Sequence, residues 1–559
     1  MTHDERRVPR RARFGLFGSA AALGLALAAC VGSLATASAG RPEHSPPPAS
    51  ASVVSRSLTV ATDKGPVEGR TTGPVDEWLG IPYSKPPTGG LRWAPPEPAA
   101  SWTGVRGALS YGNRCTQPAS GNGPRVDSED CLYLNVYAPS VIPAGKKLPV
   151  LFMIHGGGLL NGAGDQYDGS QLAQSDGIVV VSINYRLGPL GLLTLPGLSG
   201  PTTEGNFSLL DQEAALRWTA ANIAAFGGDP AKVTIAGESA GGLAVCSLLA
   251  SPPAKGLFSG AIMESGSCRS NSRATAEAES LAFAKEAGCP VAATAAACLR
   301  GKDAATLLSA GANYVPVFYT YGGADLPIPP LQAIASGRFN RVPILMGDNH
   351  DEGRLFTTGY ADYTSEQYTQ FVTDSFGTLA PRVLARYPWS AYPARYTASY
   401  AIAALLTDSW LYGGIGGCGA HQVASSLAKS APVFFYQFDD REPPAPSGGL
   451  PGFRIGAAHS LELPYLWPSF ANGNSLAAEF TPAQRELSRQ MVAYWGAFTK
   501  SGSPNEAGLP GWPAYAPRAA GGGRLMSLRP GGASRTITMT AYGAEHQCSF
   551  WDRTPAPAS

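Results

Sequence analysis

Apolar runs that favour β-strands alternate with amphipathic runs that favour helices from about residue 58 onward. Residues 147–155 (KLPVLFMIH) and 177–185 (GIVVVSINY) are nearly continuous apolar runs, whereas apolar residues recur at helical spacing in 212–226 (QEAALRWTAANIAAF). Strands that are apolar on both faces are typical of a parallel sheet covered by helices on both sides. The sequence therefore predicts an α/β fold with a mostly parallel central sheet flanked by helices.

The composition supports a large folded core. Of the 559 residues, 44% are hydrophobic and only 15% are charged, and the formal net charge is +1. A disordered chain would need low hydrophobicity and high net charge. A nucleic-acid partner is not expected either, because proteins that bind nucleic acids usually carry a large excess of positive charge. The length alone would favour two to four domains.

The N-terminus has the pattern of an export signal. Residues 1–39 combine an arginine-rich start, an apolar run over 14–29 and small residues at the end, which is typical of a signal peptide for secretion. The run is too short for a membrane span. Residues 27–30 (LAAC) also resemble a bacterial lipobox, so the alternative is a membrane-anchored lipoprotein with a lipid on Cys30. Residues 40–57, rich in Ser and Pro, are expected to form a flexible lead-in.

Export would place the nine cysteines in oxidising conditions, where disulfides form. Cys115 and Cys131 bracket one short loop, and Cys289 and Cys298 bracket another, so each pair is a candidate disulfide. Cys246 falls in an apolar helical pattern, which predicts a buried free thiol. The sequence contains no CxxC pair and no His-rich tract, which argues against a structural zinc site.

Residues 237–241 read GESAG and place Ser239 in a G-x-S-x-G pattern. The strand-like run 232–236 (KVTIA) precedes it and a helix-like run follows, so the chain must turn sharply and lift the serine out of the sheet. An acyl-transfer serine needs donors for a developing oxyanion, and residues 155–158 (HGGG) supply backbone N–H groups at the end of an upstream strand. The alternative for the GESAG motif is an ordinary tight turn between a strand and a helix, and the alternative for the HGGG motif is a flexible glycine turn.

In this fold the general base and its acid follow the serine in the order Ser, acid, His. Four histidines follow Ser239: His350, His421, His459 and His546. His459 comes after a glycine-containing loop and before an apolar run, which makes it the candidate base. For the acid, three carboxylates crowd the loop after residues 342–346: Asp348, Asp351 and Glu352. Spacing does not choose among them.

Further motifs run through the whole chain after the predicted signal. They are GIPY at 80–83, EDCLYLNV at 129–136, NYRLG at 184–188, GESAGG at 237–242, DEG at 351–353, and His459 followed by ELPY at 462–465. With these motifs the chain resembles the type-B carboxylesterases, the family that includes carboxylesterases, para-nitrobenzyl esterases and cholinesterases. The resemblance implies an α/β-hydrolase fold with large insertions.

The resemblance also implies roles for individual residues. Ser239 would be the nucleophile, His459 the base and Glu352 the acid that orients it. The backbone N–H groups of Gly157, Gly158 and Ala240 would form the oxyanion hole. Beside the serine, Glu238 would be an electrostatic element, with a simple turn residue as the alternative. The implied disulfides are Cys115–Cys131 and Cys289–Cys298. Cys418–Cys548 is the candidate for a third, although Cys418 is displaced from the family's usual position, and Cys268 has no evident partner.

The sequence therefore predicts a secreted serine carboxylesterase that acts on a small ester through an acyl-enzyme. Neither a metal nor an organic cofactor is expected, and we expect a monomer. The site residues spread from 155 to 459, so residues 58–555 should form one catalytic domain, followed by a tail at 556–559. The alternatives are a binding or adhesion relative without activity and an amide or carbamate hydrolase.

Two features of the sequence bear on the substrate. The loop between Cys115 and Cys131 contains no aromatic residue to hold a choline cation, so choline esters are not expected. Phe318, Leu355 and Phe356 could instead line an apolar acyl pocket, with core packing as the alternative.

Overall fold

The computed structural model describes residues 53–554, apart from 56, 199, 201, 312–317, 412, 445–448, 471–474 and 520–521. The predicted signal peptide, Cys30 and the tail at 556–559 lie outside the described residues, so export and lipidation stay predictions. Among the described helices, none combines the length and the apolar character that crossing a membrane requires.

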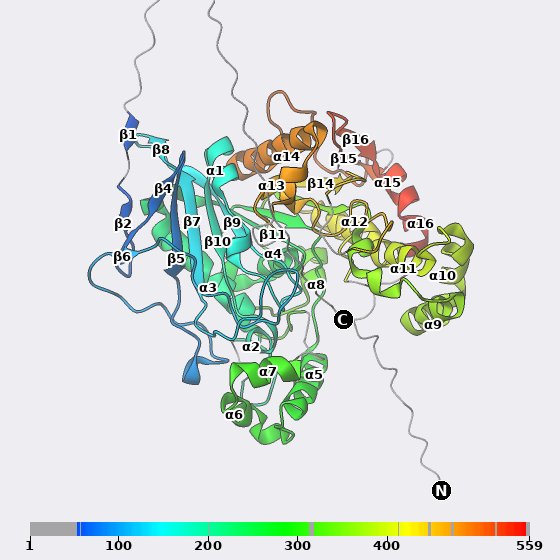
Figure 1. Cartoon of the computed structure of the whole chain (residues 1–559), viewed down its shortest axis with the longest axis horizontal. Coiled ribbons are helices and arrows are strands. Elements are labelled where there is room, and N and C mark those ends of the chain that lie inside the picture. Colours follow the sequence, from blue (N-terminus) through cyan, green and yellow to red (C-terminus); the bar gives the residue numbers. More distant parts are fainter. Residues whose placement is uncertain are drawn as a thin grey trace, which may run out of the picture.

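An 11-stranded sheet forms the centre of the molecule (Figure 1). From one edge to the other it contains β16 (Arg535–Thr538), β15 (Arg524–Leu528), β14 (Val433–Phe438), β13 (Ile344–Asn349), β12 (Gly260–Glu264), β11 (Gly228–Glu238), β9 (Leu148–Ile154), β10 (Val179–Ile183), β7 (Tyr133–Pro139), β5 (Val75–Pro82) and β4 (Arg70–Thr72). The pairings from β10 to β15 are parallel, and those at both edges are antiparallel. The predicted mostly parallel sheet is therefore confirmed.

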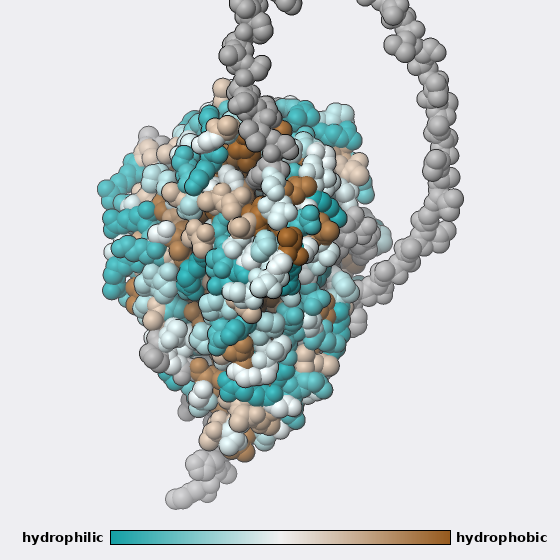
Figure 2. All heavy atoms as spheres, turned by 90° about the vertical axis from the view of Figure 1, so that its left-hand side faces the viewer, coloured by the Kyte–Doolittle hydropathy of each residue, from teal (hydrophilic) through white to brown (hydrophobic). Residues whose placement is uncertain are grey.

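Two small sheets lie beside the large one and hold the N-terminal segment. They are β1 (Val53–Ser55) with β8 (Val141–Pro143), and β2 (Thr59–Ala61) with β3 (Pro66–Glu68) and β6 (Arg106–Gly107). Figure 2 shows this side of the molecule, where hydrophilic and hydrophobic residues are intermixed on the surface.

Helices cover both faces of the large sheet. In chain order they are α1 (Ser170–Asp176), α2 (Gly188–Gly191), α3 (Phe207–Asn222), α4 (Ala240–Ala250), α5 (Arg273–Glu286), α6 (Ala295–Arg300), α7 (Ala304–Gly311), α8 (Pro330–Ala335), α9 (Ser365–Phe376), α10 (Ala380–Arg386), α11 (Thr397–Asp408), α12 (Gly417–Leu427), α13 (Leu463–Leu466), α14 (Pro482–Ser501), α15 (Met539–Glu545) and α16 (Cys548–Trp551). Figure 1 shows α5–α7 and α9–α11 as two helical insertions away from the sheet, one before β13 and one after it.

The strand β9 shows why the central strands are apolar throughout. Its side chains alternate between the two faces of the sheet. Val150, Phe152 and Ile154 belong to the same hydrophobic cluster as residues of α3 and α4, whereas Leu151 and Met153 belong to the cluster that contains residues of α1 and α14. All five side chains are buried, which is the burial that the sequence pattern predicts.

Two element boundaries differ from the sequence prediction. The helix expected over 212–226 is α3, which begins earlier at Phe207 and passes after Asn222 into a short 3-10 helix, η3 (Ile223–Phe226). The strand expected over 232–236 is β11, which begins at Gly228, with a register shift between Gly228 and Val233. Both elements are of the predicted type. Their starts and ends differ from the prediction, because element termini are less regular than the periodic core that the sequence pattern identifies.

The structure contains the two implied disulfides, Cys115–Cys131 and Cys289–Cys298, and also closes the candidate third, Cys418–Cys548. The prediction that Cys246 is a free thiol is wrong, since Cys246 pairs with Cys268, which also had no expected partner. Cys246 lies on α4 and Cys268 in the loop after β12, and both are buried. Their 22-residue separation closes a loop through a strand and its turn, a path that linear spacing does not reveal.

Candidate active site

Ser239 lies between β11 and α4, at the sharp turn that the sequence predicts. Its backbone has φ 57° and ψ −119°, a strained conformation for a residue with a side chain. Its N–H donates to the carbonyl of Glu264 at 2.9 Å. A Cβ on Gly237 would lie 2.4 Å from the Gly241 carbonyl carbon, and one on Gly241 would lie 2.1 Å from the Ile154 oxygen. The turn therefore needs both glycines, and it presents the serine at the N-terminus of α4.

His459 and Glu352 meet at the same site although 107 residues separate them. His459 Nδ1 lies 2.6 Å from Glu352 Oε2, and both side chains are buried. The other carboxylate oxygen of Glu352 accepts from Ser265 Oγ at 2.5 Å and from the Asn349 N–H at 2.7 Å. A carboxylate held from both sides in this way fixes the orientation of the imidazole.

The second ring nitrogen of His459 faces Glu238. His459 Nε2 lies 3.1 Å from Glu238 Oε1, and it makes no hydrogen bond within the described part of the chain. The expected hydrogen bond between Ser239 Oγ and His459 Nε2 is therefore not formed in this conformation. Catalytic hydrogen bonds are often long or misaligned without substrate and tighten in the complex.

The two neighbouring carboxylates set the charge of His459. Burial by itself lowers the pKa of His459, but Glu238 and Glu352 outweigh it and raise the pKa to about 8. Burial also raises the pKa of Glu238 to about 7, against the attraction of His459. Glu238 is thus an electrostatic partner of the imidazole as well as a turn residue.

The other two candidate acids have different partners. Asp348 is buried and accepts from the Tyr542 hydroxyl, and burial raises its pKa well above the usual range. Asp351 contacts two arginines, Arg354 and Arg441, at 3.0 Å each. Of the three carboxylates that the sequence left open, Glu352 is the one that hydrogen-bonds to His459.

The other histidines after the serine lie elsewhere. His350 contacts Asp351 and Glu545, and His546 Nδ1 lies 2.7 Å from Asp408. His421 is on α12. Of the four candidates, His459 is the one that the structure brings beside the residue next to Ser239.

The glycine loop packs directly against the serine. A Cβ on Gly156 would lie 3.2 Å from Ser239 Cβ. Gly157 and Gly158 have φ of 103° and 66°, and among the described residues their N–H groups find no hydrogen-bond acceptor. Ala240 is the first residue of α4, where backbone N–H groups lack helical acceptors. The glycine loop and the first residue of α4 therefore bring backbone N–H groups close to Ser239.

His155, the first residue of this loop segment, is packed against Tyr185. Its ring stacks on Tyr185, with 4.2 Å between the centroids, and burial lowers its pKa to about 4. The Tyr185 hydroxyl donates to the His155 carbonyl at 2.6 Å. His155 is thus a neutral, packed residue.

Sequence reasoning missed several polar residues of the site. Ser265, which donates to Glu352, follows β12 with φ 47°. Its place at the carboxyl end of a strand next to β11 could have pointed to it. Two more buried acids lie nearby: burial raises the pKa of Glu264 to about 8 and that of Glu462 well above its usual value.

The proposed acyl-pocket residues do not all lie together against the histidine. The Phe356 ring packs against His459, with 5.0 Å between centroids, so it borders the reaction site. Phe318 lies under the guanidinium of Arg269 at 5.2 Å. Leu355 is half-buried in the same turn as Phe356. Phe356 is therefore the strongest candidate for an acyl contact.

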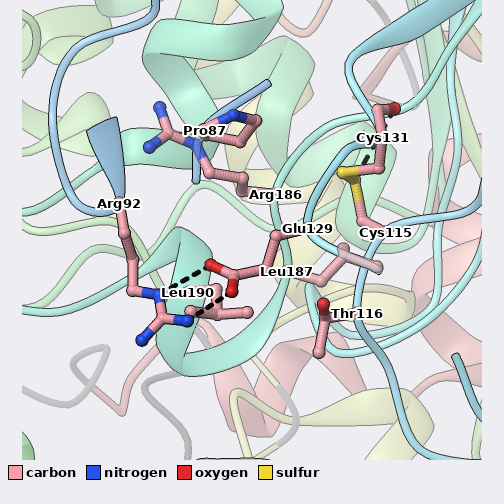
Figure 3. A pocket seen from close by; sticks show the side chains of 9 residues that line it. All are labelled: Pro87, Arg92, Cys115, Thr116, Glu129, Cys131, Arg186, Leu187 and Leu190. Carbon is pink, nitrogen blue, oxygen red and sulfur yellow. Dashed lines mark hydrogen bonds and ion pairs between the residues drawn. A yellow bond between two sulfur atoms is a disulfide. The ribbon is translucent and has the colours of Figure 1, made fainter. Parts of the chain in front are cut away.

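A separate small cavity lies beside the Cys115–Cys131 disulfide (Figure 3). Its volume is about 10 Å³, enough for about one water molecule. Arg92 and Glu129 form an ion pair on its wall. Within the described ranges, no cluster of His, Cys, Asp and Glu is suited to hold a metal ion.

The chain is similar in sequence and in fold to known proteins. The model of the carboxylesterase family matches residues 56–551. Para-nitrobenzyl esterase of Bacillus subtilis (strain 168) is 37% identical over 478 residues, which cover 82% of this chain and 92% of that protein. Human cocaine esterase is 36% identical over 495 residues, covering 80% and 83%. A solved PNB esterase structure superposes with a TM-score of 0.73 at 35% identity, covering 88% of this chain and 100% of that one.

Proposed function

Because this chain belongs to the carboxylesterase family and is a carboxylic ester hydrolase with the α/β-hydrolase fold, we propose that Ser239, His459 and Glu352 carry its reaction. The observation that supports this most is the buried hydrogen bond between His459 and Glu352, beside the strained turn that presents Ser239. A nucleophile, a base and an orienting acid are the groups that acyl transfer needs.

In the proposed reaction, Ser239 Oγ attacks the ester carbonyl carbon while His459 Nε2 takes its proton. The N–H groups of Gly157, Gly158 and Ala240 donate to the oxyanion. The imidazolium then gives its proton to the leaving alcohol, and an acyl-enzyme remains on Ser239. Water, activated by the same imidazole, attacks the acyl group, and release of the carboxylic acid restores the serine. For these steps to occur, the His459 ring must turn from Glu238 toward Ser239 when the substrate binds.

The test is a comparison of wild type with Ser239→Ala on p-nitrophenyl esters of increasing acyl length. We expect kcat to fall by about 10³-fold or more, since the nucleophile is lost. The matched control for Ser239→Ala is Ser336→Ala, at an exposed position, which should keep wild-type kcat. In a second measurement, a phosphonate inhibitor should add its mass to the peptide that contains Ser239. Retention of full turnover by Ser239→Ala would refute the proposal.

The acyl-length series also addresses the substrate. Phe356 beside His459 favours esters with an apolar acyl group, because its ring would contact that group. Leu substituted for Phe356 should change the preferred acyl length, and an unchanged profile would place the acyl group elsewhere.

We also propose that the protein is exported and works as a monomer, with residues 1–39 removed. The supporting observation is the basic and apolar N-terminal pattern. The mass of the mature protein distinguishes a free N-terminus at about residue 40 from a lipid-modified Cys30. Light scattering of the mature protein tests the monomer.

A further inference from the structure

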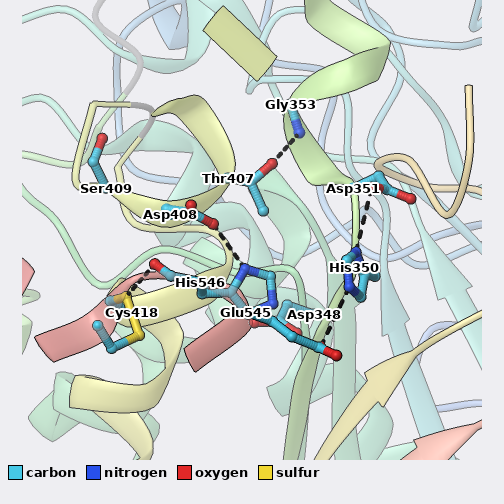
Figure 4. A network of polar contacts seen from close by, with 12 residues as sticks. Asp348, His350, Asp351, Gly353, Thr407, Asp408, Ser409, Cys418, Glu545 and His546 are labelled. Atoms are coloured by element: carbon cyan, nitrogen blue, oxygen red, sulfur yellow. Dashed lines mark hydrogen bonds and ion pairs between the residues drawn. A yellow bond between two sulfur atoms is a disulfide. The ribbon is translucent and has the colours of Figure 1, made fainter. Parts of the chain in front are cut away.

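A cavity of about 350 Å³ lies behind the turn that carries Glu352. Its walls come from η6 (Glu352–Phe356) and the preceding residues, from α11, from the loops around 392, 441 and 454, and from the end of α15. Figure 4 shows the polar contacts on this side of the molecule, where His350 lies between Asp351 and Glu545, and His546 contacts Asp408. Ser239, Glu352 and His459 do not line the cavity, so it is separate from the proposed active site.

Positive charge is in excess around this cavity. Arg354, Arg441, Arg454 and His350 line it, against the carboxylates of Asp351, Asp408 and Glu545. Burial lowers the pKa of His350, but hydrogen bonds to Asp351 and Glu545 outweigh it and raise the pKa to about 9, so the ring is protonated at neutral pH. Asp439 also contacts Arg441 at 3.6 Å, whereas Arg454 has no carboxylate contact among the described residues, so its positive charge is available at the cavity.

Three of these four cations contact the same carboxylate, that of Asp351. Asp351 contacts Arg354 Nη2 at 3.0 Å, Arg441 Nε at 3.0 Å and His350 Nδ1 at 3.3 Å. It also accepts from the Ala457 N–H at 3.0 Å, so its acceptor capacity is used. Arg454, exposed at the rim, adds a further cation.

The rest of the wall suits an apolar, flat group. Tyr392 and Tyr400 line the cavity with Ala403 and Ala404, whose small side chains leave room between them. The guanidinium of Arg354 lies over the Tyr400 ring at 5.2 Å, which keeps it at the cavity wall. A volume of about 350 Å³ is within the range of small-molecule sites.

We propose that this cavity is a binding site for an organic monocarboxylate with an aromatic body. The carboxylate would sit between Arg441, Arg354 and Arg454. The ring would lie against Tyr392 and the edge of Tyr400, whose own ring stacks on Phe453 at 4.6 Å. Arginine suits this role because its planar fork pairs with a carboxylate through two hydrogen bonds.

Calorimetric titration of the full chain with 2-naphthoate, and with uncharged 2-naphthamide of the same shape, tests the proposal. We expect naphthoate to bind about tenfold more tightly than the amide, because only the acid pairs with the arginines. Ala404→Trp should abolish binding by filling the cavity, and Arg454→Glu should weaken it about fivefold or more. Arg518→Glu, an exposed arginine outside the cavity, is the control and should bind as wild type does.

Equal affinities for naphthoate and naphthamide would overturn the proposal, as would wild-type affinity in Ala404→Trp. Equal weakening by Arg454→Glu and Arg518→Glu would assign the effect to general surface charge and also overturn it. Thermal midpoints verify that each variant is folded. Ester hydrolysis is measured on the same samples, so that failure of this proposal can be distinguished from failure of the proposed reaction. Naphthoate bound at the active site would not respond to Ala404→Trp.

Discussion

His459 lies between two buried carboxylates, and this environment decides the pH at which it can act as a base. A base must be neutral to accept the proton of Ser239. With a pKa of about 8, the imidazole is mostly protonated at neutral pH in the free protein. The proposed mechanism therefore gains activity as the pH rises through this value.

We predict that kcat/KM falls about tenfold per pH unit below pH 8, because the neutral fraction of His459 falls at that rate. In Glu238→Gln the carboxylate that attracts the imidazolium is gone, so the pKa of His459 decreases and the falling limb moves to lower pH. The pH profile of p-nitrophenyl acetate hydrolysis measures both. The control is Glu486→Gln, at a carboxylate whose side chain is 41% exposed. An identical limb in Glu238→Gln and wild type would contradict the electrostatic role.

Gly157 offers a second prediction at the residue scale. Its φ is 103°, and a Cβ there would lie 2.1 Å from the Asn161 carbonyl oxygen. In Gly157→Ala the turn must shift and its N–H would leave the oxyanion position, so we expect kcat to fall about 10²-fold, as for loss of one donor. Steady-state kinetics with the thermal midpoint check this. Gly121→Ala, at an open position where a Cβ meets nothing within 4 Å, is the control.

At the scale of elements, Asp351 joins the two loops that carry the acid and the histidine. It directly precedes Glu352, its N–H donates to the Ala457 carbonyl at 2.8 Å, and its carboxylate accepts from the Ala457 N–H. His459 is two residues further along. Asp351 therefore links the two loops, together with the hydrogen bond that Asn349 Nδ2 donates to the Ala458 carbonyl at 2.7 Å.

We expect Asp351→Asn to lower the free energy of unfolding by about 2 kcal/mol at pH 7. Burial would raise the pKa of Asp351, but His350, Arg354 and Arg441 outweigh it and lower the pKa to about 2. This stability is present above about pH 4 and is lost as the pH falls toward 2. Urea unfolding at a series of pH values should show that the difference in the free energy of unfolding between wild type and Asp351→Asn decreases as the pH falls from about 4 to about 2. Asp374→Asn, at an exposed site, should show no such trend.

The types of the elements were predictable, but their starts and some of their contacts were not. The apolar periodicity of β9 and the helical spacing of α3 come from neighbouring residues, so the local sequence contains the signal. The pairing of Cys246 with Cys268 depends instead on α4 lying beside the loop after β12. Spacing in the chain does not encode that approach.

At the scale of the whole molecule, the cross-links differ in how much chain they enclose. Cys418–Cys548 spans 130 residues and ties α12 to α16, whereas Cys289–Cys298 spans 9. Chain-entropy arguments give about 5 kcal/mol for the long loop and about 2.5 kcal/mol for the short one.

We therefore predict that Cys418→Ala with Cys548→Ala lowers the free energy of unfolding about twice as much as Cys289→Ala with Cys298→Ala. Denaturant unfolding of the two double variants measures the difference. Similar losses, or a larger one for the short loop, would show that packing strain outweighs the entropy of the unfolded chain at these sites.

The sequence by itself determined the features that depend on near neighbours. These are the buried parallel strands, the glycine-flanked turn at Ser239, the HGGG loop, and, through the resemblance, the family. The tertiary structure decided what depends on distant segments meeting. It brought Glu352, which the resemblance implies but spacing did not separate from Asp348 and Asp351, onto His459. It also turned His459 Nε2 toward Glu238 and closed the Cys246–Cys268 disulfide. The physical reason is that periodicity and turn chemistry act over a few residues, whereas these contacts join residues that only the path of the chain brings together.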